Sequence, residues 1–450
     1  MKVAAALGLC LLTACSWSNS LYQARAVSAE ALKFEREDSP GEADNAWGRA
    51  AVKAESAYAR VPSGAAGAEA LWLGGRALAR GRDCVRASTA LEGSLVLLPT
   101  APWREQLLFE LARCRDALQD PGAATLYLQL TTSSDTALRR KAQRAAGEAL
   151  LRNRQWAEAL QQLQDIDEPQ ARINRAVALA ALGRPEEAVI EVRPLLASAD
   201  TALDFVPLIE VVASESSARA EELLNSLAAS PLRTPERESR WLLAAIRGEL
   251  HADPAAADRQ LRQLLALPPD ASVRAGQLLA ADRMVARAES PTGLALRLDS
   301  LADIADEGLP RLRAEELRRI GGELVDEERA TPAGAPRGDL VLFALAENAR
   351  DSLVAPALAG WLFARVEHDW PQSPYLPKSL LARVPLLPDS IEALQARWAA
   401  LPPNPYVAYL LGRQDERFIQ LEDSMRSFNF QRAQAATGKR PRPAAAVDKE

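Results

Sequence analysis

The sequence predicts an all-α protein built from successive helical hairpins. Three observations indicate this fold class. The chain is dense in Ala, Leu, Arg and Glu, which are among the residues that lose least free energy in a helix. Segments with the alternating pattern of strands are nearly absent. Large and small residues recur at helix-contact spacings, with a period near the ~34 residues of a two-helix repeat.

The N-terminus has the pattern of an export signal. Lys2 precedes an apolar run from Val3 to Leu12, and this run is far shorter than the ~20 residues that a membrane-spanning helix needs. The segment Leu12-Thr13-Ala14-Cys15 resembles the cleavage and lipidation signal of bacterial lipoproteins. The resemblance implies removal of residues 1–14 and acylation of Cys15. The alternative is an ordinary secreted protein whose early cysteine is incidental.

Residues 15–44 are then expected to form a lipid-anchored N-terminal segment. Durable attachment to a membrane needs more than one buried acyl chain. In known lipoproteins an Asp after the acylated Cys retains the product at the inner membrane, and this chain has Ser16 and Trp17 there. The resemblance therefore implies the outer membrane, on its periplasmic face.

We expect a helical repeat array over residues 45–330. The clearest unit spans roughly 238–271. Four earlier sets of residues follow the same order of large and small positions, with less regular spacing between them. The five sets are Trp241, Ala245, Ala257, Leu261, Leu264 and Pro269; Leu71, Gly75, Leu78, Ala87, Leu91 and Pro99; Leu108, Leu111, Ala112, Ala124 and Leu128; Gly147, Leu150, Trp156, Ala159 and Leu163; and Ala176, Leu179, Gly183, Ala188, Val192 and Leu195.

These sets resemble the tetratricopeptide repeat. In the segment from Leu182 to Ala188, Gly183 can end one helix and Pro185 can open the next. Small residues at crossings let helices approach, and stacked hairpins share a core that no single hairpin has. The resemblance implies a superhelical solenoid whose extended concave face binds another protein or a peptide.

Two Pro-rich segments resemble those of periplasmic tetratricopeptide lipoproteins that act in envelope assembly, including the lipoprotein of the β-barrel assembly machinery. The closer one runs from Trp370 through Pro371, Ser373, Pro374 and Tyr375 to Leu380, and Tyr58 to Ser63 is a weaker echo. In such a turn Pro stops one helix, Ser or Pro starts the next, and the aromatic residue packs beneath.

The C-terminal part is expected to remain helical. Leu278, Ala281 and Val285 lie at helical spacing, and the run from Arg311 to Arg329 predicts a solvated amphipathic helix. The segment 331–338 contains two Pro and two Gly residues and is the expected linker. A C-terminal helical unit should follow over 339–430, and residues 431–450 are expected to form a disordered tail.

Cys84 and Cys114 are the two cysteines outside the signal and anchor. They are expected on consecutive antiparallel helices, at nearly the same height along the stack. Level position alone does not bring the side chains together, so a disulfide and two buried thiols are both open alternatives.

Signals for catalysis, metals or cofactors are not found. The chain has two histidines, His251 and His368, without the spacing of a zinc site. Asp165, Asp167 and Glu168 lack the pattern of a calcium loop and predict a solvated turn. Phosphate-binding, nucleophile-elbow and zinc-protease motifs are absent from the sequence. We therefore expect no cofactor and no enzymatic activity.

Charge and aromatic residues favour protein partners. The net charge is −6, with both signs mixed, which argues against nucleic acid. Trp72, Trp156 and Trp241 are expected in the core. The C-terminal aromatic residues, either core or docking patch, are Tyr406, Tyr409, Phe418, Phe428 and Phe430.

The expected function is a lipid-anchored periplasmic scaffold that mediates protein–protein interactions in assembly or maintenance of the cell envelope. Its partner would be a protein or peptide of the envelope, and its membrane contact would be the N-terminal anchor. The alternative is a peptidoglycan-acting enzyme or an activator of a peptidoglycan synthase, because some such proteins also carry helical superhelices. The sequence shows no Glu-Ser transglycosylase motif in the C-terminal unit.

Overall fold

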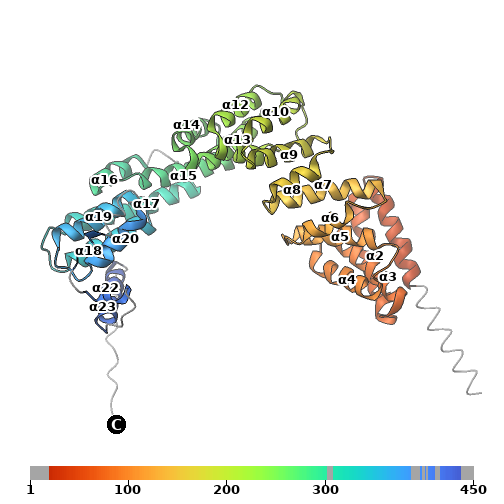
Figure 1. The fold of residues 1–450 in the computed structure, drawn as a ribbon, viewed down its shortest axis with the longest axis horizontal. Coiled ribbons are helices and arrows are strands. Elements are labelled where there is room, and N and C mark those ends of the chain that lie inside the picture. Colours follow the sequence, from red (N-terminus) through yellow and green to blue (C-terminus); the bar gives the residue numbers. More distant parts are fainter. Residues whose placement is uncertain are drawn as a thin grey trace, which may run out of the picture. The chain divides into compact units, whose positions relative to one another are not determined.

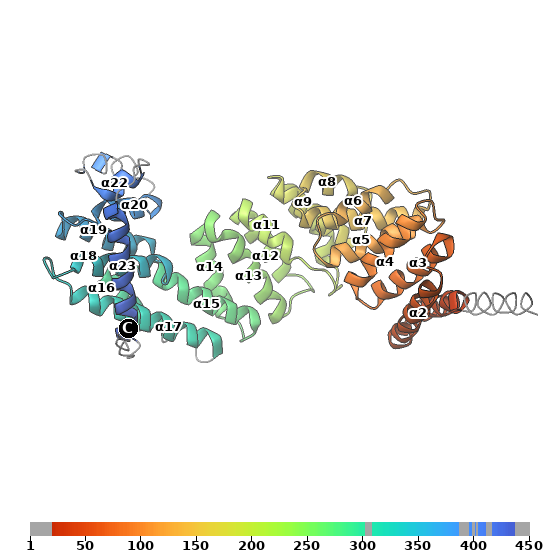
Figure 2. The same cartoon turned by 90° about the horizontal axis from the view of Figure 1, so that it is seen from below.

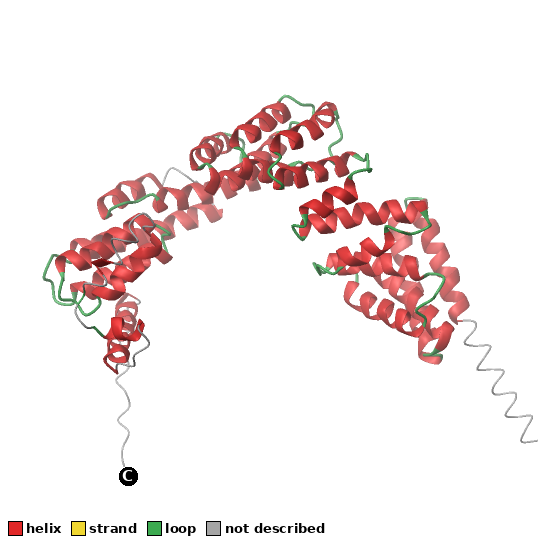
Figure 3. Ribbon diagram, in the orientation of Figure 1, coloured by secondary structure: helices red, strands yellow, loops and turns green. Residues whose placement is uncertain are grey.

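The chain is all-helical, as a computed structural model describes it over residues 20–301, 308–386, 396–397, 401, 404–410 and 416–436. Within these ranges every regular element is an α-helix or a short 3-10 helix (Figure 3). The predicted all-α, helical-hairpin fold class is thereby confirmed. The expected signal peptide and Cys15 lie outside the described residues. The chain divides into two compact units, Met1–Gln260 and Leu261–Glu450.

The first unit opens with helical residues 20–36, followed by helices joined through short turns (Figures 1 and 2). They are α2 (Pro40–Arg60), α3 (Gly64–Arg80), α4 (Cys84–Leu97), α5 (Arg104–Ala117), α6 (Ala123–Leu130), α7 (Thr136–Arg152), α8 (Trp156–Leu163), α9 (Pro169–Ala181), α10 (Pro185–Val192), the 3-10 helix η1 (Arg193–Ala197), α11 (Val206–Glu215), α12 (Ser217–Ala228) and α13 (Pro235–Ala252). The boundary between the units falls inside α14 (Pro254–Leu265).

Each helix of the first unit packs against its neighbour in the chain, and the first helices of successive hairpins also contact one another. The helices α3, α5, α7, α9, α11 and α13 thus form a continuous row, which we call the first-helix row. This two-level packing is characteristic of repeat proteins, in which each hairpin buries its apolar face against the next.

Two glycines show how the repeat pattern works. A Cβ atom at Gly75 of α3 would lie 2.7 Å from Cγ of Leu91 on α4, and one at Gly147 of α7 would lie 2.4 Å from Cγ of Leu163 on α8. Both leucines are fully buried. Each pair has the same separation in sequence, so the small residue of the first helix receives the leucine of the second.

The turn predicted from Gly183 and Pro185 is also observed. The helix α9 ends at Ala181, Gly183 adopts a φ of 74°, and α10 begins at Pro185. The NH group of Arg184 donates to the carbonyl of Leu179, which satisfies one of the last carbonyls of α9.

The array begins earlier than the expected residue 45. Helical residues 20–36 and α2 pack together through Ala31, Ala46 and Trp47, all of which are essentially inaccessible to solvent. The Trp47 indole also donates to the Glu35 carboxylate at 2.8 Å. Much of the expected anchoring segment 15–44 is therefore folded against the array, because its alanines recur at helical spacing and let the two helices approach closely.

The second unit contains α15 (Ala271–Ala286), α16 (Pro291–Ser300), α17 (Gly308–Arg329), α18 (Gly338–Asp351), α19 (Pro356–Asp369), α20 (Leu376–Arg383), the 3-10 helix η3 (Val384–Leu386), α22 (Pro405–Leu410) and α23 (Glu416–Ala436). One hydrophobic cluster extends across it, from Val285 through Phe343 to Met425.

The expected linker 331–338 forms the turn between α17 and α18, as its Pro and Gly residues predict. It does not separate two units, because α17 packs against α18 and the hydrophobic cluster continues across the turn. Proline and glycine stop a helix without deciding whether the flanking helices share a core. The expected tail, residues 431–450, does not begin at residue 431, because α23 extends to Ala436. Residues 437–450 lie outside the described residues.

The Pro-rich turn after Trp370 has the predicted construction. The Trp370 ring lies over Gly338, where an added Cβ would come within 2.3 Å of Cζ2. The Ser373 hydroxyl donates to Asp339 at 2.7 Å and accepts from the NH group of Tyr375, whose ring is buried.

Among the described helices, none combines the length and the apolar character needed to cross a bilayer.

Candidate functional site

The first-helix row carries a groove with room for a ligand. Two adjoining cavities, of about 660 and 560 Å³, share Trp156, Glu210 and Val211. We call the combined feature the α7–α13 groove. Its lining residues are Glu148, Leu151, Arg152, Arg154, Trp156, Gln170, Asn174, Val177, Ala181, Pro207, Glu210, Val211, Ser214, Glu215, Arg247, Gly248, His251 and Ala252.

Helical periodicity explains why these residues share one surface. Gln170, Asn174, Val177 and Ala181 recur three or four residues apart and so form one stripe along α9. On α11, Pro207 and Val211 are four residues apart, as are Glu210 and Ser214, so these four residues also lie on one side of their helix. The other stripe of α9 faces the core, where Ala176 is completely buried. The repeat therefore fixes one face of each helix inward and leaves the other face for the groove.

Gly248 sets the distance between the two helices at one end of the groove. A Cβ atom at this position would lie 2.3 Å from the carbonyl oxygen of Glu210 and 2.7 Å from Cβ of Ala213. Both contacts are shorter than real Cβ contacts, so only glycine allows the backbones of α11 and α13 to approach this closely. The spacing of α11 and α13 in this wall of the groove therefore depends on Gly248.

Trp156 departs from its predicted place in the core. Trp72 and Trp241 are 5% and 3% exposed, as expected, whereas Trp156 is only half-buried and borders both cavities. It is the first residue of α8, one turn before the buried Ala159. At this helix end the ring extends over the groove. A half-exposed tryptophan offers a large rigid surface for an apolar side chain.

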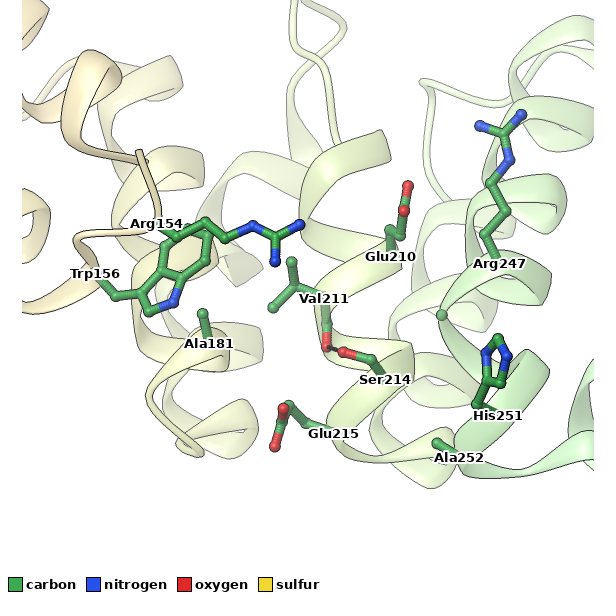
Figure 4. A pocket seen from close by; sticks show the side chains of 11 residues that line it. Arg154, Trp156, Ala181, Glu210, Val211, Ser214, Glu215, Arg247, His251 and Ala252 are labelled. Atoms are coloured by element: carbon green, nitrogen blue, oxygen red, sulfur yellow. Dashed lines mark hydrogen bonds between the residues drawn. The ribbon is translucent and has the colours of Figure 1, made fainter. Parts of the chain in front are cut away.

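Charged groups flank the tryptophan without being paired. Arg154 and Trp156 lie on one side of the larger cavity, and Arg247 and His251 lie on the opposite side (Figure 4). Neither Arg154 nor Arg247 forms an ion pair with a described residue, and the same holds for Glu210. The groove therefore presents unpaired charges of both signs around an apolar centre.

The beginning of the first-helix row is different. There Arg80 donates to Glu35 at 2.9 Å and to Glu110 at 2.9 Å. Arg76 lies between the rings of Trp47 and Trp72, 5.6 and 5.4 Å from their centroids. Arg76 and Arg80 are thus held by aromatic rings and carboxylates of the chain itself, although Arg76 Nε, Arg80 Nε and Glu110 Oε2 have no hydrogen-bond partner among the described residues. The α7–α13 groove, where Arg154, Arg247 and Glu210 form no ion pair with a described residue, is the better candidate for binding a partner.

Two carboxylates near the groove have perturbed acidity. Burial raises the pKa of Glu148, an effect that Arg144 and Arg152 partly oppose. Glu249, next to Gly248, is completely buried, and neither carboxylate oxygen has a hydrogen-bond partner among the described residues. Burial and the neighbouring Asp253 raise the pKa of Glu249 to about 7. Glu249 faces the protein interior and does not line the groove.

The remaining candidates from the sequence lie apart from one another. His251 borders the groove, whereas His368 is exposed and contacts Asp369 at 2.7 Å. In the acidic turn, Asp167 pairs with Arg172 and Glu168 pairs with Arg144. No three His, Cys, Asp or Glu residues in the described ranges are grouped as metal ligands.

The C-terminal aromatic residues mostly pack in the second unit. Tyr406 is buried, stacks edge-on with Phe418 at 5.4 Å and donates its hydroxyl to Glu422 at 2.8 Å. The Phe428 ring lies under the Arg337 guanidinium, whereas Phe430 is exposed. The side chain of Tyr409 lies outside the described residues.

Cys84 and Cys114 come together as their heights along the stack suggested. Cys84 packs against the small cluster of buried residues that contains Cys114, and both cysteines are free thiols.

Sequence reasoning placed no residue in the groove. Aligning the small residues of the repeats would have located the groove side of each first helix. On α9, the inward repeat positions are Ala176 and Leu179; Val177 lies between them and Ala181 follows them, and both line the groove. Arg154 lies in the turn between α7 and α8, where the repeat pattern carries no signal, and Trp156 is a contact position of the repeat at the first residue of α8, from which the sequence predicted a core position.

Comparison with known proteins gives no family for this chain. No family model matches it, and no curated protein matches it. Among solved structures, it is similar to a chain of "Structure of Naa15/Naa10 bound to HypK-THB", with 13% sequence identity and a TM-score of 0.28. That alignment covers 87% of this chain and 70% of the other. The helical-hairpin fold is established by the helices and contacts described above.

Proposed function

We propose that this protein is a lipid-anchored periplasmic scaffold whose α7–α13 groove binds an extended segment of another envelope protein. The observation that carries the proposal is the groove itself: one continuous surface from α7 to α13, with a half-exposed tryptophan and unpaired charges of both signs. Such a surface suits a peptide with one large apolar side chain flanked by an acidic and a basic residue.

The size of the groove supports an extended ligand. Adjacent packed helices lie 8–10 Å apart, so the row from α7 to α13 spans on the order of 27 Å. An extended chain rises ~3.4 Å per residue, which corresponds to a segment of about eight residues. A peptide of this length can contact all four helices at once, whereas a small metabolite would occupy one cavity.

The location rests on the N-terminal sequence. The short apolar run, the Leu12-Thr13-Ala14-Cys15 segment and the residues Ser16 and Trp17 support an acylated protein on the periplasmic face of the outer membrane. A role in envelope assembly or maintenance is the part of the proposal that follows from this location. The proposal assigns no chemical reaction to the chain.

Site-specific photocrosslinking in cells that produce the protein naturally tests this function. A photoreactive phenylalanine derivative replaces Val211 in the groove, and the control carries it at Val96, which is 79% exposed on α4. The expected result is a crosslink to an envelope protein from position 211 that is absent at position 96. The crosslink should disappear in the Arg247→Glu variant.

Equal crosslinking at both positions would argue against the groove as the binding site. Recovery of peptidoglycan enzymes alone would favour the role of a synthase activator. Release of peptidoglycan fragments by the purified protein would replace the scaffold by an enzyme.

A further inference from the structure

The cysteine pair lies at the junction between two repeats. Cys84 is the first residue of α4, the second helix of one hairpin, and Cys114 lies in the last turns of α5, the first helix of the next. The two helices pack against each other. Cys84 packs against the cluster of buried residues that contains Cys114.

The pair lies in a small hydrophobic cluster. The buried residues that cluster with Cys114 are the small Ala79 and Ala87, and Leu78 and Cys84 pack against them. A disulfide requires the two Cβ atoms to face each other at about 3.5–4.5 Å, and the packing of both cysteines in one cluster between α4 and α5 brings them toward this arrangement.

The two thiols differ in accessibility. Cys114 is completely buried, whereas Cys84 is partly exposed. Burial, together with the contact to Cys84, raises the pKa of the Cys114 thiol above its ordinary value. An oxidant in solution can therefore reach Cys84 first, and Cys114 reacts only through Cys84.

We propose that Cys84 and Cys114 form an intramolecular disulfide that joins the α3/α4 hairpin to the α5/α6 hairpin, by exchange with a small-molecule or protein disulfide. The Cys84 thiolate attacks one sulfur of the donor disulfide, which forms a mixed disulfide and expels one donor thiolate. Cys114 then attacks the Cys84 sulfur and expels the second donor thiolate. The two cysteine protons end on the donor thiols, so the chain loses two electrons and the donor gains them.

Oxidation of the purified full-length chain tests the chemistry. The reduced protein is incubated with glutathione disulfide, free thiols are blocked by alkylation, and the cysteines are mapped by mass spectrometry. The expected product is a Cys84–Cys114 crosslink without bound glutathione. The Cys114→Ala variant should instead retain glutathione on Cys84, and the Cys84→Ala variant should leave Cys114 unmodified.

Stability provides a second measurement. Closing a loop of this length should raise the Tm of the first unit by roughly 5–15 °C, and a reductant should reverse the rise. The Cys84→Ala/Cys114→Ala variant should show no response to the reductant. Two results would overturn the proposal. One is glutathione that persists on Cys84 of the unmodified protein. The other is labelling of Cys114 in the Cys84→Ala variant as fast as Cys84 is labelled in the unmodified protein.

Formation of the bridge in cells rests on the proposed periplasmic location, because that compartment is oxidising. Alkylation of intact cells before lysis separates the two proposals. A bridge in both experiments supports both. A bridge that forms with glutathione disulfide but is absent in cells supports the geometry and counts against the location, whereas failure with glutathione disulfide refutes the bridge itself.

Discussion

Replacing Gly147 by alanine should destabilise the first unit, although alanine is the better helix former. The added Cβ would lie 2.4 Å from Cγ, 2.6 Å from Cδ2 and 3.0 Å from Cδ1 of Leu163. Leu163 is completely buried, so it cannot move into solvent to relieve the contact. The α7–α8 pair must therefore separate or distort.

The expected magnitude follows from two opposing effects. Alanine is favoured over glycine in a helix interior by about 1 kcal/mol. Overpacking a well-packed core costs roughly 1–3 kcal/mol, and three short contacts with one buried side chain place this site near the upper limit. The net loss in the free energy of unfolding should be about 2 kcal/mol.

Gly48 provides the matched control, because it lies within α2 with no heavy atom within 4 Å of an added Cβ. Gly48→Ala should stabilise the protein by about 1 kcal/mol.

Urea titrations followed by circular dichroism, at matched protein concentration, measure both variants. The Gly147→Ala/Leu163→Ala double variant should lose less stability than the sum of the two single variants, because the smaller side chain removes the contact. If Gly147→Ala is as stable as the unmodified chain while Gly48→Ala is more stable, the close approach of α7 and α8 is wrong. Additive single effects would lead to the same conclusion.

Three further outcomes are expected. Glu249→Gln should raise the free energy of unfolding by roughly 1–3 kcal/mol at pH 8 and change it little at pH 4. The folded-state pKa of Glu249, about 7, exceeds the ordinary value of 4.5, so the wild-type chain loses stability as the pH rises from 4.5 to about 7. Equal effects at both pH values in urea titrations would contradict this. Cys15→Ala should abolish incorporation of a labelled fatty acid in cells, and retained label would exclude that residue as the acylation site. Trp156→Ala should weaken binding of the groove partner at least tenfold, which corresponds to about 1.4 kcal/mol. The Tm should fall by no more than a few degrees. Unchanged affinity in a titration with the purified partner would show that Trp156 is not part of the binding site.

The sequence predicted the local structure correctly where a residue with a special conformational or steric property marks a turn or a helix contact. Gly183 and Pro185 mark a turn that the structure contains, and Gly147 and Leu163 are the small and large partners of one hairpin contact. In each case the conformational property of a single residue determines the local structure, so a pattern in one dimension is sufficient.

A helical hairpin without such marker residues was not assigned to a repeat from the sequence. The α11/α12 hairpin turns at Ser216 with neither Gly nor Pro nearby, and none of the five predicted sets covers it. The unit boundary within α14 and the half-exposed position of Trp156 depend on which helices meet in space. The groove could not be predicted for the same reason, since it joins residues from five helices far apart in the chain.

Among the described residues, the main contacts within the first-helix row join each helix to the next along the series. Mechanical load or thermal fraying at one hairpin is therefore transmitted stepwise, and a damaged end can open while distant hairpins stay intact. A hairpin could also be duplicated or lost during evolution without rebuilding the remainder. The length of such a protein is thus an easily adjusted trait.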